Sequence, residues 1–402
     1  MKNSSKLTTI SALLLVGGAT SLMADSIESL LEANFTKLEA TVPGKFGLNY
    51  RLRYEEFETP TRETAGVSHR VRYSYQTENY NGFTAMIEGE TLSRIGDDAD
   101  EIHFLDNAGD GTELNQLWVQ YKHEDFGHIK VGQQVYALDD LRFIGHVGWR
   151  QNIQSFDAVT TEYTGFEDLS IKAFYLSQQH MVNGSHNDLD ALGLNVSYDF
   201  DKALKLTGFL YNIEGADTTN RGQSNFTAGL RANGTFTASD IEFAYSASLA
   251  EQTEAGNIAD YNASYYAGDL KGTLSGVSLG LGFEILEPGF KTPLATVHKF
   301  NGFADKFLPL AGLPNGLEDY YIYAGYKIPL GNGIAFKAIY HSFDSEDGAV
   351  SYGDEFDFVV SYKINKYTNV MAKYGDYSAD SGAGGAGAGD KRMFTLDLNF
   401  IY

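Results

Sequence analysis

The chain has 402 residues, a net charge of −23 at pH 7, no cysteine, and 26 residues each of tyrosine and phenylalanine. Without cysteine it forms neither a disulfide framework nor a thiolate metal site. Beyond the N-terminal segment no stretch approaches the roughly 18 apolar residues that a membrane-spanning helix requires, so helical membrane spans are excluded.

Residues 1–24 have the layout of a secretory signal peptide. Lys2 and Lys6 precede an apolar run from Leu7 to Val16, and small residues follow up to Ala24. Because the apolar run is too short to span a bilayer, we expect this segment to be removed on export.

Residues 25–44 depart from the alternating pattern that fills the rest of the chain. Their apolar side chains recur near helical spacing, and Asp25 followed by Glu28 forms a potential capping box. We predict a short amphipathic helix, either on the periplasmic side of the barrel described next or inside its mouth. A disordered segment is the alternative.

From residue 45 onward, apolar and polar residues alternate with the period of two that marks a β-strand. The first segment sends Arg51 and Arg53 to one face and Leu52 and Tyr54 to the other. The last segment repeats the alternation and ends on the aromatic Tyr402, which is typical of the closing strand of a bacterial outer-membrane barrel. After two strands near residues 45 and 70, further strands are predicted to begin near residues 83, 113, 127, 156, 169, 191, 204, 225, 241, 261, 277, 320, 334, 355, 368 and 391.

The connections between these segments alternate in length. Short ones, rich in the Gly, Asn and Asp that tolerate a left-handed backbone, separate long ones near residues 93–111, 134–155, 178–190, 212–224, 251–260, 286–319, 344–354 and 376–390. Short periplasmic turns and long extracellular loops are the rule for outer-membrane barrels. We therefore predict an all-β fold for residues 45–402, a transmembrane antiparallel β-barrel of about eighteen strands, with about sixteen as the alternative.

The third long loop is unusually apolar for an external loop. Leu141, Phe143, Ile144 and Trp149 must pack against something, and the barrel interior is available. We therefore expect this loop to fold inward and form the pore constriction, with its polar side chains facing the lumen. These are Asp139, Asp140, Arg142, His146 and Arg150.

Two parts of the sequence resemble a known family. The first comprises residues 111–116, 132–134, 142–152 and 156–158, and the second comprises residues 290–307. They are similar to the alginate-export-type outer-membrane porins, although the family pattern usually has Trp where this chain has Phe303. The resemblance implies a monomeric barrel of about eighteen strands with a basic pore. The loop at 286–319 also carries several phenylalanines, and we expect it to cover the outer mouth.

Basic residues on the inward faces supply the expected pore lining. They are Arg51, Arg53, Arg70, Arg72, Lys130, Lys172 and Arg231. Arginine keeps its charge when buried and binds carboxylates in a bidentate fork, so a patch of arginines suits an anionic solute. The alternative is that they pair with the inward Glu88, Glu90 and Glu113 and only brace the wall.

We therefore predict a porin for passive diffusion of small or polymeric anionic solutes, and not an enzyme. The alternatives are a structural or adhesive barrel with a plugged lumen, and an envelope hydrolase, for which nine histidines and many serines are available. His146 and His298 lie in the third long loop and in the loop at 286–319, where we expect them to form hydrogen bonds. Expected partners are outer-membrane lipid, lipopolysaccharide, the assembly machinery and an anionic or polyuronate solute, with no nucleic acid, cofactor or metal. The acidic runs 97–101 and 344–347 are interpreted as solvated loops, with calcium binding as the alternative.

Overall fold

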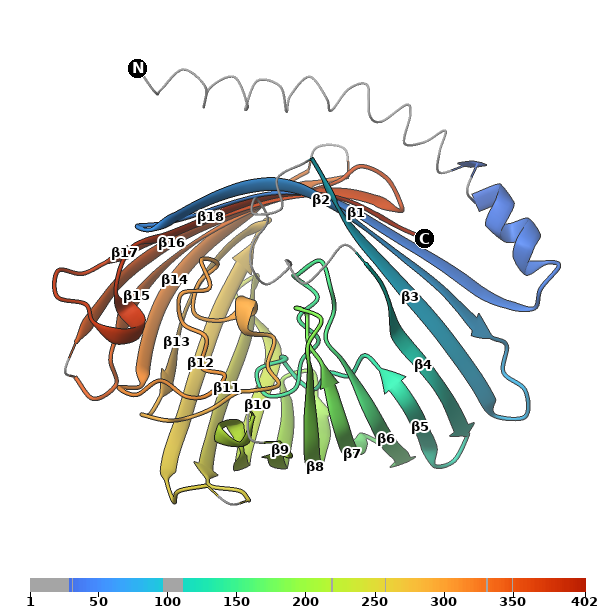
Figure 1. Cartoon of the computed structure of the whole chain (residues 1–402), viewed down its shortest axis with the longest axis horizontal. Coiled ribbons are helices and arrows are strands. Elements are labelled where there is room, and N and C mark those ends of the chain that lie inside the picture. Colours follow the sequence, from blue (N-terminus) through green and yellow to red (C-terminus); the bar gives the residue numbers. More distant parts are fainter. Residues whose placement is uncertain are drawn as a thin grey trace.

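The computed structural model describes residues 29–30, 32–96, 111–217, 220–256, 258–329, 332–348 and 350–402. They contain one antiparallel sheet of eighteen strands that closes on itself (Figure 1). The first and last strands pair in register, with Leu52 opposite Leu398 and Arg53 opposite Asp397. Closure leaves no sheet edge, which is the condition for a sheet to span a bilayer. The predicted fold and its strand number are confirmed.

The strands follow the predicted starts closely. Their bounds are β1 Gly44–Thr59, β2 Arg62–Thr77, β3 Phe83–Ile95, β4 Gly111–His123, β5 Gly127–Gln134, β6 Ser155–Phe166, β7 Leu169–His180, β8 His186–Asp201, β9 Leu204–Gly215, β10 Asn225–Ala238, β11 Ile241–Thr253, β12 Asn262–Leu274, β13 Val277–Leu286, β14 Leu317–Ile328, β15 Ile334–Asp344, β16 Ser351–Lys363, β17 Thr368–Ala379 and β18 Lys391–Ile401. Short 3-10 turns lie at Arg221–Gln223, Val297–Lys299 and Gly385–Gly387.

Short and long connections alternate around the barrel. The end that holds Tyr402 carries tight turns such as residues 239–240 and 275–276, where Asp240 and Gly276 have φ of 67° and 81°. Left-handed residues at such positions give a turn whose twist matches the flanking strands. The opposite end carries the two longest connections described, residues 135–154 and 287–316. The predicted signal segment and the acidic run 97–101 lie outside the described residues.

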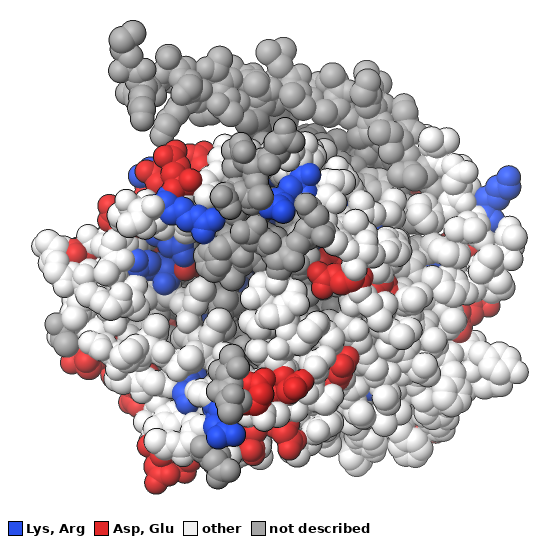
Figure 2. Space-filling view, in the orientation of Figure 1, with Lys and Arg blue, Asp and Glu red and all other residues white. Residues whose placement is uncertain are grey.

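Apolar side chains cover the outward face of the barrel. Leu279 and Leu281 on β13 are 63% and 59% exposed, whereas Asp397 on the inward face of β18 is 1% exposed. Much of the outer surface over β4–β7 carries no charged side chain (Figure 2). Exposed aromatic side chains mark both ends of this apolar band, including Tyr80, Phe126, Phe166 and Phe200 near the short turns and Tyr320, Tyr340 and Phe356 near the long loops. An apolar band between aromatic girdles is the lipid-facing surface of an outer-membrane barrel.

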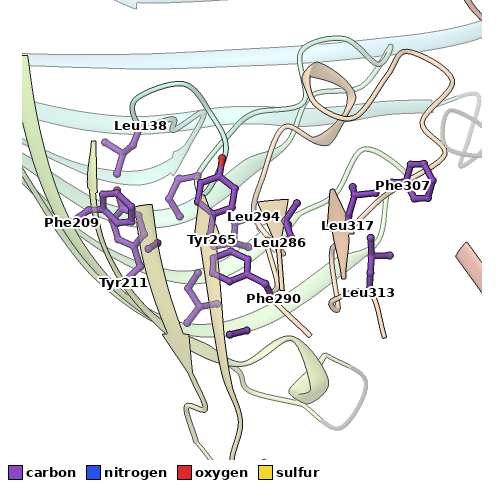
Figure 3. Close-up of a cluster of buried hydrophobic side chains, with 14 of the residues drawn as sticks. Leu138, Phe209, Tyr211, Tyr265, Leu286, Phe290, Leu294, Phe307, Leu313 and Leu317 are labelled. Atoms are coloured by element: carbon purple, nitrogen blue, oxygen red, sulfur yellow. The ribbon is translucent and has the colours of Figure 1, made fainter. Parts of the chain in front are cut away.

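The hydrophobic core lies inside the barrel, where the two longest connections pack against the wall. Leu138 and Ile144 come from the first connection, and Phe290, Leu294 and Phe307 come from the second (Figure 3). They pack on inward-facing strand residues that include Phe209, Tyr211, Tyr265 and Leu317. The loop predicted to cover the outer mouth, residues 286–319, thus folds into the barrel, with Phe290 and Phe307 buried and Phe300 and Phe303 half-buried.

A helix covers the described residues 29–30 and 32–39 and lies outside the ring of strands (Figure 1). Phe35 stacks on Tyr402 with ring centroids 4.3 Å apart, which places the helix at the end of the barrel with the short turns. No helix within the described residues is long and apolar enough to cross a membrane.

The two faces of β11 provide a test of the lipid-facing surface. Leu249 points outward and is 50% exposed, whereas Ser246 lines the lumen. An arginine on the lipid face at the bilayer midplane costs roughly 2–4 kcal/mol. We expect Leu249→Arg to reduce the yield of folded, heat-modifiable barrel severalfold in gel-shift assays, and Ser246→Arg to fold at the wild-type level. Equal yields would contradict the assignment of the faces.

Candidate functional site

Four arginines on β1 and β2 hold the backbone of the first inward loop. This arginine clamp consists of Arg51, Arg53, Arg70 and Arg72. Its guanidinium groups donate hydrogen bonds to the carbonyl oxygens of every residue from 148 to 151, at 2.7 to 3.3 Å. Hydrogen bonds from a charged donor are stronger than neutral ones, so the clamp fixes this turn against the wall.

The charge of the arginine clamp is compensated within the wall. Arg53 pairs with Asp397 at 2.7 Å, and Arg72 forms a short ion pair with Glu90, which also lies 3.7 Å from Arg70. The side chains of Arg53 and Arg70 are 1% and 0% exposed. The expectation that these arginines form a basic pore lining open to solute is therefore corrected, because their donors are turned toward the loop backbone and toward wall carboxylates.

Four carboxylates on β13, β14 and β16 hold the second inward loop in the complementary way. This carboxylate clamp consists of Glu284, Asp319, Glu355 and Asp357. Asp357 and Glu355 accept hydrogen bonds from the backbone N–H groups of Phe303 and Ala304, at 3.0 and 2.6 Å. The Asn301 amide donates to Glu284 at 2.6 Å and to Asp319 at 3.3 Å. A loop inside a barrel has little water to satisfy its peptide groups, and here the wall supplies the partners.

Two ion pairs tie the first loop to its surroundings. Arg142 pairs with Glu284 at 2.8 Å, and Arg150 pairs with Asp305 of the second loop at 2.6 Å. Both arginine side chains are 1% exposed. The expectation that Arg142 and Arg150 face the open lumen is therefore corrected, because their guanidinium groups are buried at the contact between loops and wall.

Backbone and ring contacts join the two loops directly. The N–H of Gly145 donates to the carbonyl of Leu294 at 2.8 Å, and the N–H of Thr296 donates to the carbonyl of Leu141 at 2.9 Å. The rings of Trp149 and His298 stack in parallel, with centroids 4.1 Å apart and an interplanar angle of 1°. The two loops therefore form one packed unit inside the barrel.

His298 is held neutral at the centre of this unit. Burial lowers its pKa to about 3, so the imidazole is uncharged at neutral pH. The neutral ring donates from Nδ1 to Asp305 at 2.7 Å and accepts at Nε2 from Lys373 at 3.3 Å. Burial alone would raise the pKa of Asp305, but His298 and Arg150 hold it well below its usual range. The carboxylate of Asp305 therefore stays charged and keeps its partners.

The acidic residues of the first loop are more accessible than its arginines. Asp139 accepts a hydrogen bond from Asn195 at 2.8 Å, and burial raises its pKa. Asp140 forms a short ion pair with Arg231 on β10, and its carbonyl accepts from Lys299 at 2.8 Å. The Asp140 and Arg231 side chains are 21% and 16% exposed, so this pair borders the open lumen.

The remaining predicted residues lie apart from the loop contact. Lys130 places its ammonium 4.4 Å from the centre of the Trp118 ring, and Lys172 lies 3.6 Å from Glu162. They line a separate small cavity of about 190 Å³ beside β5–β7. His146 accepts from the N–H of Gly148 at 3.0 Å, and burial lowers its pKa.

A larger cavity of about 530 Å³ lies between the two loops and the wall formed by β10–β17. Arg231, Lys299, Lys337 and Lys373 contribute cations to its lining. The three lysines were not among the residues expected to line the pore. The alternation of β15 and β17 already assigns Lys337 and Lys373 to the inward face, so this signal was available. Within the described residues, no group of three or more His, Asp or Glu side chains is arranged to hold a metal ion.

The Arg142–Glu284 pair provides a test of the packing of the first loop. Removing one member of a buried ion pair leaves an uncompensated charge and costs roughly 3–5 kcal/mol. We expect Arg142→Met to lower the free energy of unfolding by about this amount, as measured by urea denaturation in lipid vesicles. Adding Glu284→Gln should restore most of the loss, because the orphaned charge is then removed. No recovery in the double variant would mean that the pair is not the origin of the effect.

The comparisons with known proteins agree with this architecture. OccAB2 of Acinetobacter baumannii has a TM-score of 0.71 at 13% sequence identity, covering 90% of this chain and 98% of that one. OccK8 of Pseudomonas aeruginosa has a TM-score of 0.69 at 13% identity, with the same coverage of both chains. OpdK of Pseudomonas aeruginosa, solved with vanillate, has a TM-score of 0.70 at 12% identity, covering 89% and 98%. At these identities the likeness shows the fold alone.

Sequence comparison supplies the family. No curated protein matches the chain. The model of the alginate export family matches residues 42–279, which is more than half of the chain. With the closed barrel and its lipid-facing band, this makes the protein an outer-membrane channel and not an enzyme. The chain belongs to the alginate export family of outer-membrane porins.

Proposed function

We propose that this porin passes small anionic solutes and that the cations around the cavity between the two loops select them. The observation that carries the proposal is the state of Lys337 and Lys373. Their ammonium groups lie 4.2 Å from the Tyr323 ring and 3.7 Å from the Trp149 ring. The ammonium of Lys373 also donates to Nε2 of His298 at 3.3 Å. Within the described residues, neither lysine has a carboxylate oxygen within 4.0 Å, so no ion pair there neutralises them.

The carboxylates of the same cavity are already engaged by protein donors. Asp269 accepts from the hydroxyl groups of Tyr321 and Tyr323 at 3.2 and 2.9 Å. Asp319 accepts from His341 at 2.8 Å and also from Asn301, and Asp357 accepts from the second loop. A solute cation would have to compete with these bonds, whereas a solute carboxylate would meet the ammonium groups of Lys337 and Lys373, which no carboxylate of the described residues pairs. The local arrangement therefore favours anions although the whole chain is acidic, because distant exposed charges are screened within about 8 Å at physiological salt.

The fixed position of the loops favours small solutes over polymers. Both loops are bound to the wall by charged side chains and to each other by Arg150–Asp305, and the cavity they leave is about 530 Å³. A polyuronate chain would need a wider continuous path, so it is the second candidate. The structural neighbour OpdK was solved with vanillate, which supports a small solute for this barrel architecture.

The proposal also covers how the channel is exported, inserted into the outer membrane and surrounded there. The alternating pattern of β18 and its terminal aromatic residue support insertion by the outer-membrane assembly machinery. The unbroken apolar band around the barrel supports a monomer surrounded by lipid and lipopolysaccharide. The basic N-terminal segment supports export through a cleaved signal peptide.

The reversal potential in a planar bilayer with a salt gradient tests the proposal. We expect the wild-type channel to prefer anions, and Lys299→Gln combined with Lys337→Gln to shift the reversal potential toward cations by at least several millivolts, because rings and clusters of fixed charge set pore selectivity. Lys202→Gln, at an exposed turn outside the lumen, is the matched control and should change little. Cation preference in the wild type would overturn the proposal, and a folded barrel without conductance would establish the plugged alternative.

A further inference from the structure

The helix at residues 32–39 is fastened to the outward face of the barrel seam. Phe35 stacks on Tyr402, and Glu32 accepts hydrogen bonds from Tyr367 at 2.8 Å and from Lys366 at 3.1 Å. Glu39 accepts from the backbone N–H of Phe46 at 3.1 Å. The helix therefore links the turn before β17, the end of β18 and the start of β1, where the barrel closes.

One flank of this helix exposes apolar side chains. Leu30, Leu38 and Val42 are 64%, 40% and 39% exposed. Leu30 and Leu38 are eight residues apart, which places them on neighbouring parts of one helix face. The residues that bind the barrel, Glu32, Phe35 and Glu39, follow the i, i+3, i+7 spacing of a different face. The barrel therefore leaves the apolar side chains of Leu30 and Leu38 uncovered.

An apolar groove of about 510 Å³ runs beside the helix on the outward wall of β1–β4. Phe35 of the helix borders it together with Phe46, Leu48, Tyr73, Ile87 and Leu114. A β-bulge between Glu88 and Gly89 interrupts β3 at this point. A side chain at Gly89 would meet the ring of Tyr73, since an added Cβ would lie 2.6 Å from it. The glycine therefore lets the tyrosine ring lie flat along the wall.

The position of the helix and groove identifies what covers them. The helix lies on the outward face at the end with the short turns, and the groove runs from the helix along the outward wall to Leu114 near the start of β4. This surface continues the lipid-facing band. Amphipathic helices at such a boundary lie in the plane of the interface, with their apolar side roughly 5–10 Å into the headgroup and acyl region.

We propose that the helix at residues 32–39 lies in the periplasmic leaflet of the outer membrane and that acyl chains of phospholipid fill the groove between the helix and β1–β4. Leu30 and Leu38 face the acyl region, while the bonds from Glu32 and Glu39 hold the helix at the depth of the girdle. The site is independent of the solute path, because it lies on the outer wall.

The absence of cysteine makes single labelled cysteines unique in this chain. Nitroxide labels at Leu38→Cys and Ile87→Cys report on the helix flank and the groove in the full-length barrel in phosphatidylethanolamine vesicles. Leu281→Cys on the lipid-facing wall is the acyl-chain reference, and Ala33→Cys on another side of the helix is the aqueous reference. The measurement is the ratio of collision rates with molecular oxygen, which concentrates in lipid, and with a water-soluble nickel chelate.

We expect labels at positions 38 and 87 to give oxygen-favoured ratios close to that at 281, and severalfold above that at 33. Adding Phe35→Ser should release the helix, so the ratio at position 38 should fall toward the aqueous value while that at 87 stays high. A water-exposed ratio at position 38 in the otherwise unchanged chain would overturn the placement of the helix. A water-exposed ratio at 87 would overturn the filling of the groove by lipid. Neither result depends on conductance, so the proposed solute is tested separately.

Discussion

Charged side chains of the barrel wall bind the backbone of two loops inside the lumen, and the rest of the interior depends on these bonds. The charge of each wall side chain is opposite to the partial charge of the loop group that it binds. The arginine clamp faces the carbonyl oxygens of residues 148–151. The carboxylate clamp faces the backbone N–H groups of Phe303 and Ala304 and the side-chain amide of Asn301. A chain segment that enters a barrel loses much of its water, and each unpaired peptide group there carries a free-energy cost. Arginines on β1 and β2 and carboxylates on β13, β14 and β16 thus satisfy one loop each.

The clamps act only because their own charges are compensated. Asp397 and Glu90 neutralise part of the arginine clamp, and Arg142 neutralises part of the carboxylate clamp. Buried charges are stabilised when they are both paired and hydrogen-bonded, and removing one member leaves the other exposed to an apolar surrounding. The loops consequently join the wall in one cooperative network, with Arg150 and Asp305 as the link between them.

The same network decides which charges remain for a solute. Six of the arginines are used to build the interior, and the channel is left with the Asp140–Arg231 pair and three lysines around one cavity. The basic residues that hold the loops in place are therefore different from those proposed to select the solute. The outer wall obeys a separate constraint, because it meets only lipid. There the apolar band, the aromatic girdles and the helix beside Tyr402 form one continuous surface.

The alternation of apolar and polar residues along the chain was sufficient to predict the barrel. The period of two assigns each strand residue to a face, and the alternation of short and long connections gives the strand number and the end on which the termini lie. Phe83, Gly127, Leu169, Ile241 and Val277 begin strands where the pattern predicts. The apolar residues of the third loop also predicted that this loop is buried, and it is.

The partners of its arginines could not be predicted from the alternation of residues along the chain. Arg142 meets Glu284 and Arg150 meets Asp305, more than a hundred residues away in each case. Such pairs exist only after the barrel has closed and the second loop has entered it, so only the tertiary structure decides whether a charge supports the wall or faces the lumen.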